Sequence, residues 1–279
     1  MRILITGGGG HLGTALQTEL IEHELFAFPR AELDITDKEA VFTAVSTTSP
    51  DLIIHTAAYT NVDDCAKDPD YAYKVNGLGT QNVALACQQF GAALVHISTN
   101  EVFAGDNLAG YEEWMPRNPV NAYGRSKAAA EAHVQNLLNR YYIVRPAWLY
   151  APQGRNFIHA ILDRARQTGH LRVVSDEVGN PTHTQDVAQA IGQLIKTEQY
   201  GIYHFVNCGS CSRWEFANEI LQLAGLTNVV NTPILGKEFK RPSTPPPYCA
   251  LHNIAGKAIG IELRPWQEAL ADYFNQHVN

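Results

Sequence analysis

Short apolar runs alternate with helical patterns through the first half of the chain. The predicted strands cover residues 2–6, 25–28, 51–58, 93–98 and 142–148. The predicted helices lie between them, at residues 12–21, 37–46, 70–89 and 121–139. The run DLIIHTAA at 51–58 is uniformly apolar rather than alternating, which is typical of a strand buried on both faces. This order of elements indicates βαβ units, and therefore an α/β fold with a doubly wound parallel sheet.

Beyond about residue 150 the alternation becomes irregular. Strands are predicted at 172–174 and 203–206, and helices at 185–196, 214–223 and 266–276. The segment KRPSTPPPYCALHN (240–253) carries four of the fourteen prolines, so we expect no regular element there. The pattern predicts a first lobe over residues 1–150, to which later segments return, and a smaller C-terminal lobe mainly over residues 151–279.

A glycine-rich loop, TGGGGHLG, connects the first predicted strand to the first predicted helix. Gly7, Gly10 and Gly13 form a GxxGxxG pattern. The first glycine allows a tight turn, the second lets the backbone approach a pyrophosphate, and the third lets the helix pack close to the sheet. The helix N-terminus then presents unpaired N–H groups to the phosphates. In this strand–turn–helix context the loop predicts a Rossmann-type, NAD(P)-binding first lobe.

The end of the second predicted strand bears on the choice of dinucleotide. It reads FAFPR, so Arg30 stands where a carboxylate for the adenosine ribose is expected. An arginine suits the 2′-phosphate of NADP(H), and this favours NADPH while leaving NAD(H) open. Asp34, slightly further on, is a candidate contact for the adenine or the ribose. The alternative for Arg30 is a solvated surface charge.

Tyr123 and Lys127 lie four residues apart at the start of a predicted helix, and therefore on one face of it. Tyrosine, with a pKa of about 10, becomes an acid–base group at neutral pH when a nearby cation favours its phenolate. Lys127 can supply that cation and hold a ribose hydroxyl of the cofactor, and Thr99 can supply a second hydroxyl. A carbonyl held by Thr99 and Tyr123 would accept hydride from a nicotinamide while Tyr123 donates the proton.

Charge and composition exclude several other classes. The net charge of −7 argues against a nucleic-acid surface, and no apolar run approaches the ~18 residues that a membrane span needs. The chain begins with a strand rather than a cleavable signal, so we expect a cytoplasmic protein. Cys208 and Cys211 form a CxxC, but no second pair or nearby histidine completes a metal site. We expect no metal and reduced, incidental thiols, with a redox pair as the alternative.

Longer stretches, spread over nearly the whole chain, carry a family resemblance. They are AAYTNVDDCAKDPDYAYKVN, LVHISTNEVFAG, NPVNAYGRSKAAAE, RPAWLY, GRNFI, LRVVSDEVGNPTHTQDVA, HFVNCGSCSRWEFA and KRPSTPPPYCALHN. In these stretches the chain resembles the extended short-chain dehydrogenase/reductases, and among them the dTDP-4-dehydrorhamnose reductases. The resemblance implies an oxidoreductase of dTDP-rhamnose biosynthesis that uses NADP(H) or NAD(H). It further implies a nucleotide-sugar substrate, a dTDP-linked 4-keto-6-deoxy sugar, and allows a homodimer.

The resemblance also assigns residues to three groups. It makes the catalytic trio Thr99, Tyr123 and Lys127. Its cofactor contacts, beside Arg30 and Lys127, are Gly7, Gly10, His11, Leu12, Asp34, Ile35, Ala57, Ala58 and Tyr59. Its substrate contacts are Asn100, Glu101, Trp148, Asn156 and Arg241. A packed strand aromatic is the alternative for Trp148 and ordinary surface polarity for Asn156, whereas a diphosphate would suit Arg241.

The strand end HISTNEVFAG departs from the reductase pattern, which reads Ser-Thr-Asp-Tyr-Val-Phe. Asn100 replaces the aspartate and Glu101 the tyrosine. The related nucleotide-sugar 4,6-dehydratases carry Thr-Asp-Glu, in which the glutamate removes a proton and the aspartate protonates the departing hydroxyl. Asn100 cannot act as that acid. Glu101 could still serve as the base of an epimerase or dehydratase, or only bind sugar hydroxyls. A non-catalytic, NAD(P)-binding regulatory subunit, like the β subunit of methionine adenosyltransferase, is a third hypothesis.

Overall fold

The computed structural model of the protein describes residues 1–154 and 156–277. At its centre is a six-stranded parallel sheet with the order β2-β1-β3-β4-β5-β10. The strands are β1 (Arg2–Thr6), β2 (Glu24–Phe28), β3 (Leu52–His55), β4 (Ala93–Ile97), β5 (Tyr141–Val144) and β10 (Gly201–Tyr203). The chain starts inside the sheet, winds to one edge at β2 and then, through β3, to the other. The predicted doubly wound parallel sheet is thereby confirmed.

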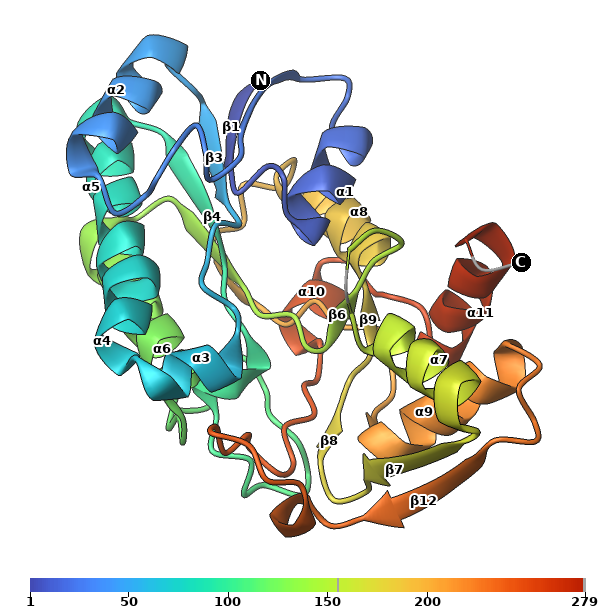
Figure 1. The fold of residues 1–279 in the computed structure, drawn as a ribbon. Coiled ribbons are helices and arrows are strands. Elements are labelled where there is room, and N and C mark those ends of the chain that lie inside the picture. Colours follow the sequence, from blue (N-terminus) through green and yellow to red (C-terminus); the bar gives the residue numbers. More distant parts are fainter. Residues whose placement is uncertain (155, 278–279) are drawn as a thin grey trace.

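Helices cover both faces of this sheet (Figure 1). One face carries α1 (His11–Glu19) and α8 (Thr184–Leu194), and the other carries α2 (Lys38–Thr48), α5 (Gly79–Phe90) and α6 (Ala122–Leu137). Along β1, Ile3 and Ile5 pack against the first face and Leu4 against the second. Side chains of a strand point alternately to opposite faces, so a strand covered on both faces is apolar throughout. This explains the uniformly apolar runs in the sequence.

A second hydrophobic core forms from later elements. It joins α7 (Phe157–Thr168), α9 (Arg213–Leu223), α11 (Trp266–His277) and β7 (His170–Val174), which pairs with β12 (Val230–Ile234). Aromatic rings fill it, and Tyr150 contacts both Phe216 and Tyr273.

Segment 240–253 contains no helix or strand, as its prolines predict. Among the described residues, no helix is long and apolar enough to cross a membrane.

Short elements complete the fold. They are α3 (Val62–Lys67), α4 (Pro69–Ala72), the π-helical η1 (Tyr73–Leu78), the 3-10 turns η2 (Asn100–Val102) and η3 (Gly236–Glu238), α10 (Ile254–Ala258), β6 (Leu149–Tyr150), β8 (Val178–Gly179), β9 (Thr182–His183) and β11 (Cys211–Ser212). The small strands pair as β6 with β9 and β8 with β11. Tyr150 of β6 and Cys211 of β11 contribute side chains to the second core, so these strand pairs lie beside it.

Two strands, β5 and its edge neighbour β10, have bounds that differ from the prediction. The strand predicted at 142–148 ends at Val144, because Pro146 has no N–H to continue the ladder and Trp148 has a φ of +42°, which a strand does not allow. The strand predicted at 203–206 is β10, two residues earlier. Its register is set by β5: Tyr203 pairs with Val144, and the N–H of Arg145 makes the last bond between the two strands, to the carbonyl oxygen of Tyr203 (2.8 Å).

The helix predicted at 70–89 is also interrupted, by the π-helical turn η1. Within that turn Asn76 accepts a hydrogen bond from Tyr59 N (2.7 Å) and donates to Ser126 Oγ (2.9 Å). The wide turn therefore lets one amide join the loop after β3 to helix α6, a use typical of π-turns at functional sites. Helices α3 and α7 were not predicted, and the strand predicted at 51–58 ends at His55.

A buried ion pair connects helix α6 to the ends of two strands. Arg145, just after β5, donates to both carboxylate oxygens of Glu131 in α6 (2.8 and 2.7 Å), and the two residues are 1% and 0% exposed. Ser98, just after β4, donates to the same carboxylate at 2.5 Å. Burial raises the pKa of Glu131, but the charge and hydrogen bonds of Arg145 outweigh it and hold that pKa below its usual value. Helix α6 is therefore fixed to the strand ends by a charged contact.

We expect Arg145→Met to destabilise the fold by up to about 3–5 kcal/mol, because it removes two bonds to the buried carboxylate of Glu131 and leaves only Ser98 and the partly exposed Arg117 (3.1 Å) as partners. Urea unfolding followed by circular dichroism measures the loss. Glu24→Gln is the control, since it breaks the exposed pair of Arg2 and Glu24 (3.1 Å) and should cost less than about 1 kcal/mol. Equal losses in the two variants would contradict this interpretation.

Candidate active site

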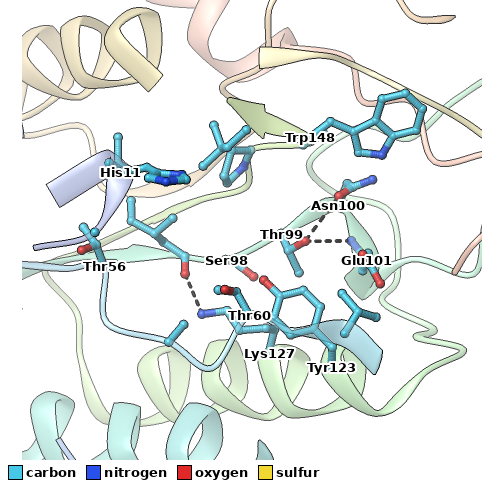
Figure 2. A pocket seen from close by; sticks show the side chains of 18 of the residues that line it. His11, Thr56, Thr60, Ser98, Thr99, Asn100, Glu101, Tyr123, Lys127 and Trp148 are labelled. Atoms are coloured by element: carbon cyan, nitrogen blue, oxygen red, sulfur yellow. Dashed lines mark hydrogen bonds between the residues drawn. The ribbon is translucent and has the colours of Figure 1, made fainter. Parts of the chain in front are cut away.

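Two adjoining cavities lie where the carboxyl ends of the central strands meet the loops that follow them. The central cavity, of about 460 Å³, contains Thr99, Tyr123 and Lys127 (Figure 2). The loop cavity, of about 350 Å³, extends along the glycine-rich loop toward Arg30 and Asp34. Both cavities are lined by Gly10, Thr56 and Ala58, so they adjoin directly.

The glycine-rich loop has room for glycine alone at its critical positions. Gly7 has a φ of +72°, and a Cβ added there would lie 2.7 Å from the backbone nitrogen of Ala57. A Cβ on Gly13 would lie 2.4 Å from the carbonyl oxygen of Gly7. Gly10 is the N-cap of α1 and provides no side-chain cap, so the first N–H groups of the helix stay available to a ligand. This is the geometry that a pyrophosphate requires.

The far end of the loop cavity holds the residues predicted on the adenosine side. Arg30 is exposed, and its Nη2 donates to the hydroxyl of Tyr71 at 2.8 Å. One carboxylate oxygen of Asp34 accepts from both the backbone N–H and the hydroxyl of Thr36 (2.9 Å each), and these bonds hold the pKa of Asp34 below its usual value. The other predicted residues of this group, Gly7, Ile35, Ala57, Ala58 and Tyr59, line the same cavity.

The predicted trio comes together in the central cavity. Tyr123 and Lys127 point from one face of α6 into the cavity, where the hydroxyl of Tyr123 faces Thr99, the residue two positions after β4 (Figure 2). Lys127 is 1% exposed and its Nζ donates to the carbonyl oxygen of Ile97 at 2.7 Å. The hydroxyl of Thr99 accepts from the backbone N–H of Glu101 (3.2 Å) and donates to Asn100 Oδ1 (3.3 Å). His11 lies on the opposite side of the cavity from Lys127.

Burial governs the electrostatics of the trio. Burial and then the negative charge of Glu101 raise the pKa of Tyr123, and the expected support of its phenolate by Lys127 stays a prediction. Tyr123 is a neutral phenol and therefore holds a proton that it can donate. Burial lowers the pKa of Lys127 to about 8, with Glu131 acting in the opposite direction. The lysine is charged below that pH and neutral above it.

Asn100 and Glu101, the two unusual residues, both have partners within the protein. Asn100 donates to the carbonyl oxygen of Cys249 at 3.2 Å. Glu101 Oε2 accepts from Asn121 Nδ2 at 2.6 Å, and burial raises the pKa of this carboxyl. Asn121 is also the N-cap of α6, where its side chain accepts from Gly124 N at 2.8 Å. One amide therefore connects Glu101 to the helix that carries Tyr123 and Lys127.

The substrate contacts predicted further out line two more cavities. An outer cavity of about 620 Å³ contains Trp148, Asn156 and Arg241, and a small one of about 90 Å³ contains Glu101, Trp148 and Arg241. Trp148 therefore lines cavities and lies outside the strands, and its ring also packs against Gly179 and Arg213. Asn156 caps α7 by accepting from His159 N at 3.2 Å, so its amide has a structural use as well. Arg241 pairs with Glu177.

Sequence reasoning missed several cavity residues. Arg213 lines the central, small and outer cavities, and Thr56, Thr60 and Ser98 line the central one. The sequence signal at Arg213 was the capping box of Ser212 and Glu215, which marks a helix start but says nothing about a ligand.

Among the described residues, no group of three or more histidine, cysteine or acidic side chains is arranged to hold a metal ion. All five cysteines are free thiols, with Cys208 exposed and Cys211 buried.

The chain is similar to known proteins over its whole length. The family model described as "RmlD substrate binding domain" matches residues 1–279. The crystal structure of a dTDP-4-dehydrorhamnose reductase from Bacillus anthracis, in complex with NADP, superposes with a TM-score of 0.95, is 40% identical and covers 99% of each chain.

Two curated relatives extend this comparison. The dTDP-4-dehydrorhamnose reductase of Mycolicibacterium smegmatis is 37% identical over 97% of this chain and 84% of its own. The spore coat polysaccharide biosynthesis protein SpsK of Bacillus subtilis is 36% identical over 99% of this chain and 97% of its own. Together these matches confirm the resemblance deduced from the sequence.

We expect Lys127 to titrate near pH 8, because burial disfavours its charged form. NMR of the protein labelled with ¹³C at lysine Cε gives the titration of each lysine, and the resonance lost in Lys127→Arg identifies the right one. A midpoint near the ordinary value of about 10.4 would mean that the ammonium is well solvated and would contradict the structure.

Proposed function

The chain belongs to the family described as the RmlD substrate binding domain, and we propose that it reduces the C4 ketone of a nucleotide-linked 4-keto-6-deoxy sugar with NADPH. The observation that supports this most directly is the meeting of Thr99, Tyr123 and Lys127 in one cavity that adjoins the glycine-rich loop. Relatives whose names state this reaction match nearly the whole chain.

The residues present fit a nicotinamide dinucleotide. The glycines leave space at the start of α1, and the loop and central cavities together extend from Arg30 to Tyr123. The pyrophosphate would bind at Gly10, His11 and Leu12, and the exposed guanidinium of Arg30 suits a 2′-phosphate. Lys127 would hold the nicotinamide ribose. When bound, NADPH supplies the hydride that reduces the carbonyl carbon.

The side chains around the carbonyl supply orientation and the proton. Tyr123 is protonated at neutral pH, so its phenol can donate a hydrogen bond to the ketone oxygen and then give up the proton as the oxygen gains charge. Below pH 8, the ammonium of Lys127 favours the phenolate that this leaves. The hydroxyl of Thr99, now bonded to Asn100, can turn to the same oxygen. The products are an alcohol at C4 and NADP⁺.

We propose that the C-terminal lobe, mainly residues 151–279, binds the sugar nucleotide. The outer cavity combines the aromatic rings of Phe157 and Phe216 with the cations Arg172 and Arg241, a composition suited to a base and a diphosphate. A dTDP-linked substrate, a cytoplasmic location and a homodimer remain part of the proposal. The relatives carry different sugar names, which leaves the configuration of the sugar to experiment.

A second candidate function rests on Glu101, whose carboxylate lines the same cavity as Tyr123. A base beside a ketone could epimerise the neighbouring carbon, and the raised pKa of Glu101 suits such a base. Asn100 offers no acid to complete a dehydration. A non-catalytic, NAD(P)-binding subunit is the third candidate, and the assembled trio counts against it.

The main test is NADPH consumption, followed by absorbance, with dTDP-4-keto-6-deoxyhexoses as substrates. We expect Tyr123→Phe to lower kcat by about 10²- to 10⁴-fold, the contribution of a positioned proton donor, without loss of NADPH binding. Tyr141→Phe, at the start of β5 and outside the cavities, is the matched control and should keep full activity. If the wild-type protein reduces no 4-keto sugar nucleotide with either reduced cofactor, the proposed function is wrong.

The variant Glu101→Gln distinguishes the reductase hypothesis from the epimerase hypothesis. In the reductase the change should lower activity by no more than about tenfold, the scale of one hydrogen bond, because glutamine still fills the site and can bond to Asn121. The sugar recovered from deuterium oxide should carry no solvent deuterium beside C4. Deuterium that enters with the wild type and not with the variant would instead establish Glu101 as an epimerising base.

A further inference from the structure

Arg213 is a half-buried cation whose side chain has no hydrogen-bonding partner in the described part of the chain. It is the first residue of α9, and its backbone N–H donates to the carbonyl oxygen of Glu177 at 3.1 Å. Its Cζ lies 3.5 Å from the centre of the Trp148 ring and 5.2 Å from that of Phe157. Within residues 1–154 and 156–277, its side chain donates no hydrogen bond and forms no ion pair, unlike Arg241 and Arg145.

The stacked geometry leaves the binding edge of the guanidinium free. A guanidinium uses its flat face to stack on an aromatic ring, whereas its five N–H donors point outward in the plane of the group. Burial lowers the pKa of Arg213 to about 10, so the group is still charged at neutral pH. The charges of Glu177 and Glu101 favour its charged form, but within the described residues no carboxylate forms a hydrogen bond with it, and charged cavity residues with a shifted pKa are concentrated at ligand sites.

The position of Arg213 indicates which part of a ligand it meets. Arg213 and Trp148 both line the central, small and outer cavities, and therefore lie where these cavities adjoin. The central cavity holds Tyr123, where the sugar ketone would lie, and the outer cavity has the aromatic rings suited to a base. In a nucleotide-linked sugar, the group between the sugar and the nucleoside is the diphosphate. Arg241 lines the small and outer cavities beside it.

We propose that Arg213 binds the diphosphate of the substrate, with Arg241 as the second cation of the same site. This inference rests on the proposed function and adds a residue to it. Arginine suits the role because its fork can donate two parallel hydrogen bonds to phosphate oxygens. Stacking on Trp148 holds the fork in one plane before the ligand arrives, which lowers the entropic cost of binding. Glu177, the partner of Arg241, balances the charge of that residue.

Titration calorimetry with dTDP as the probe tests this assignment. Arg213→Met should weaken dTDP binding by about 10- to 100-fold, because it removes charge-assisted hydrogen bonds. The binding of thymidine and of NADPH should stay unchanged. Arg213→Lys keeps the charge without the planar fork and should give an intermediate loss. Arg166→Met, on the exposed side of α7, is the matched control and should bind dTDP like the wild type.

Kinetics give a second readout, in which Arg213→Met should raise KM for the sugar nucleotide by a similar factor while kcat changes little. If the wild type binds dTDP and reduces the sugar nucleotide but Arg213→Met binds dTDP equally well, this inference is wrong and the proposed function stands. Loss of NADPH binding in the variant would show a general structural role and also overturn it. A wild type that binds neither dTDP nor UDP and reduces no sugar nucleotide would overturn both proposals.

Discussion

The buried contact between Glu131 and Arg145 is the constraint on which the site depends. The carboxylate of Glu131 lies one helical turn after Lys127 on α6, and it receives hydrogen bonds from Arg145 after β5 and from Ser98 after β4. Ser98 directly precedes Thr99. A single acid therefore fixes the helix that carries two members of the trio to the strand end that carries the third. Ion pairs of this kind contribute little net stability compared with an apolar core, but the loss of one partner is costly.

Burial of the three side chains sets the protonation of the trio. Exclusion of water disfavours the charged form of any group, so it lowers the pKa of Lys127 and raises that of Tyr123. The result is a neutral phenol beside a lysine that is charged at neutral pH. A reductase needs a proton on the tyrosine when the reaction starts, and a cation nearby when that proton has left. The first condition holds for an ordinary tyrosine, with a pKa of about 10, and burial and Glu101 strengthen it. The second condition holds because the pKa of Lys127, about 8, is still above neutral pH.

The sequence predicted what depends on local patterns and missed what depends on distant contacts. The βαβ rhythm and the glycine loop are local, and both were identified correctly. The end of β5 was not, because it depends on Arg145 turning inward and on the φ of +42° at Trp148. The π-helical turn is set by the hydrogen bonds of Asn76 to partners 17 and 50 residues away. Arg213 was missed for the same reason, since only the folded chain brings α9 against Trp148.

The bonds of Glu101 favour a positioning role over that of a base. An epimerising base must approach a carbon-bound hydrogen and then move its proton elsewhere, which requires a carboxylate that can turn. One oxygen of Glu101 is held by Asn121, and Asn121 also caps the helix of Tyr123 and Lys127. Turning the carboxylate would remove that bond and disturb the cap, at a typical cost of about 1 kcal/mol for the cap alone. The arrangement is better suited to a fixed group that accepts a hydrogen bond from a sugar hydroxyl while its charge helps to keep Tyr123 protonated.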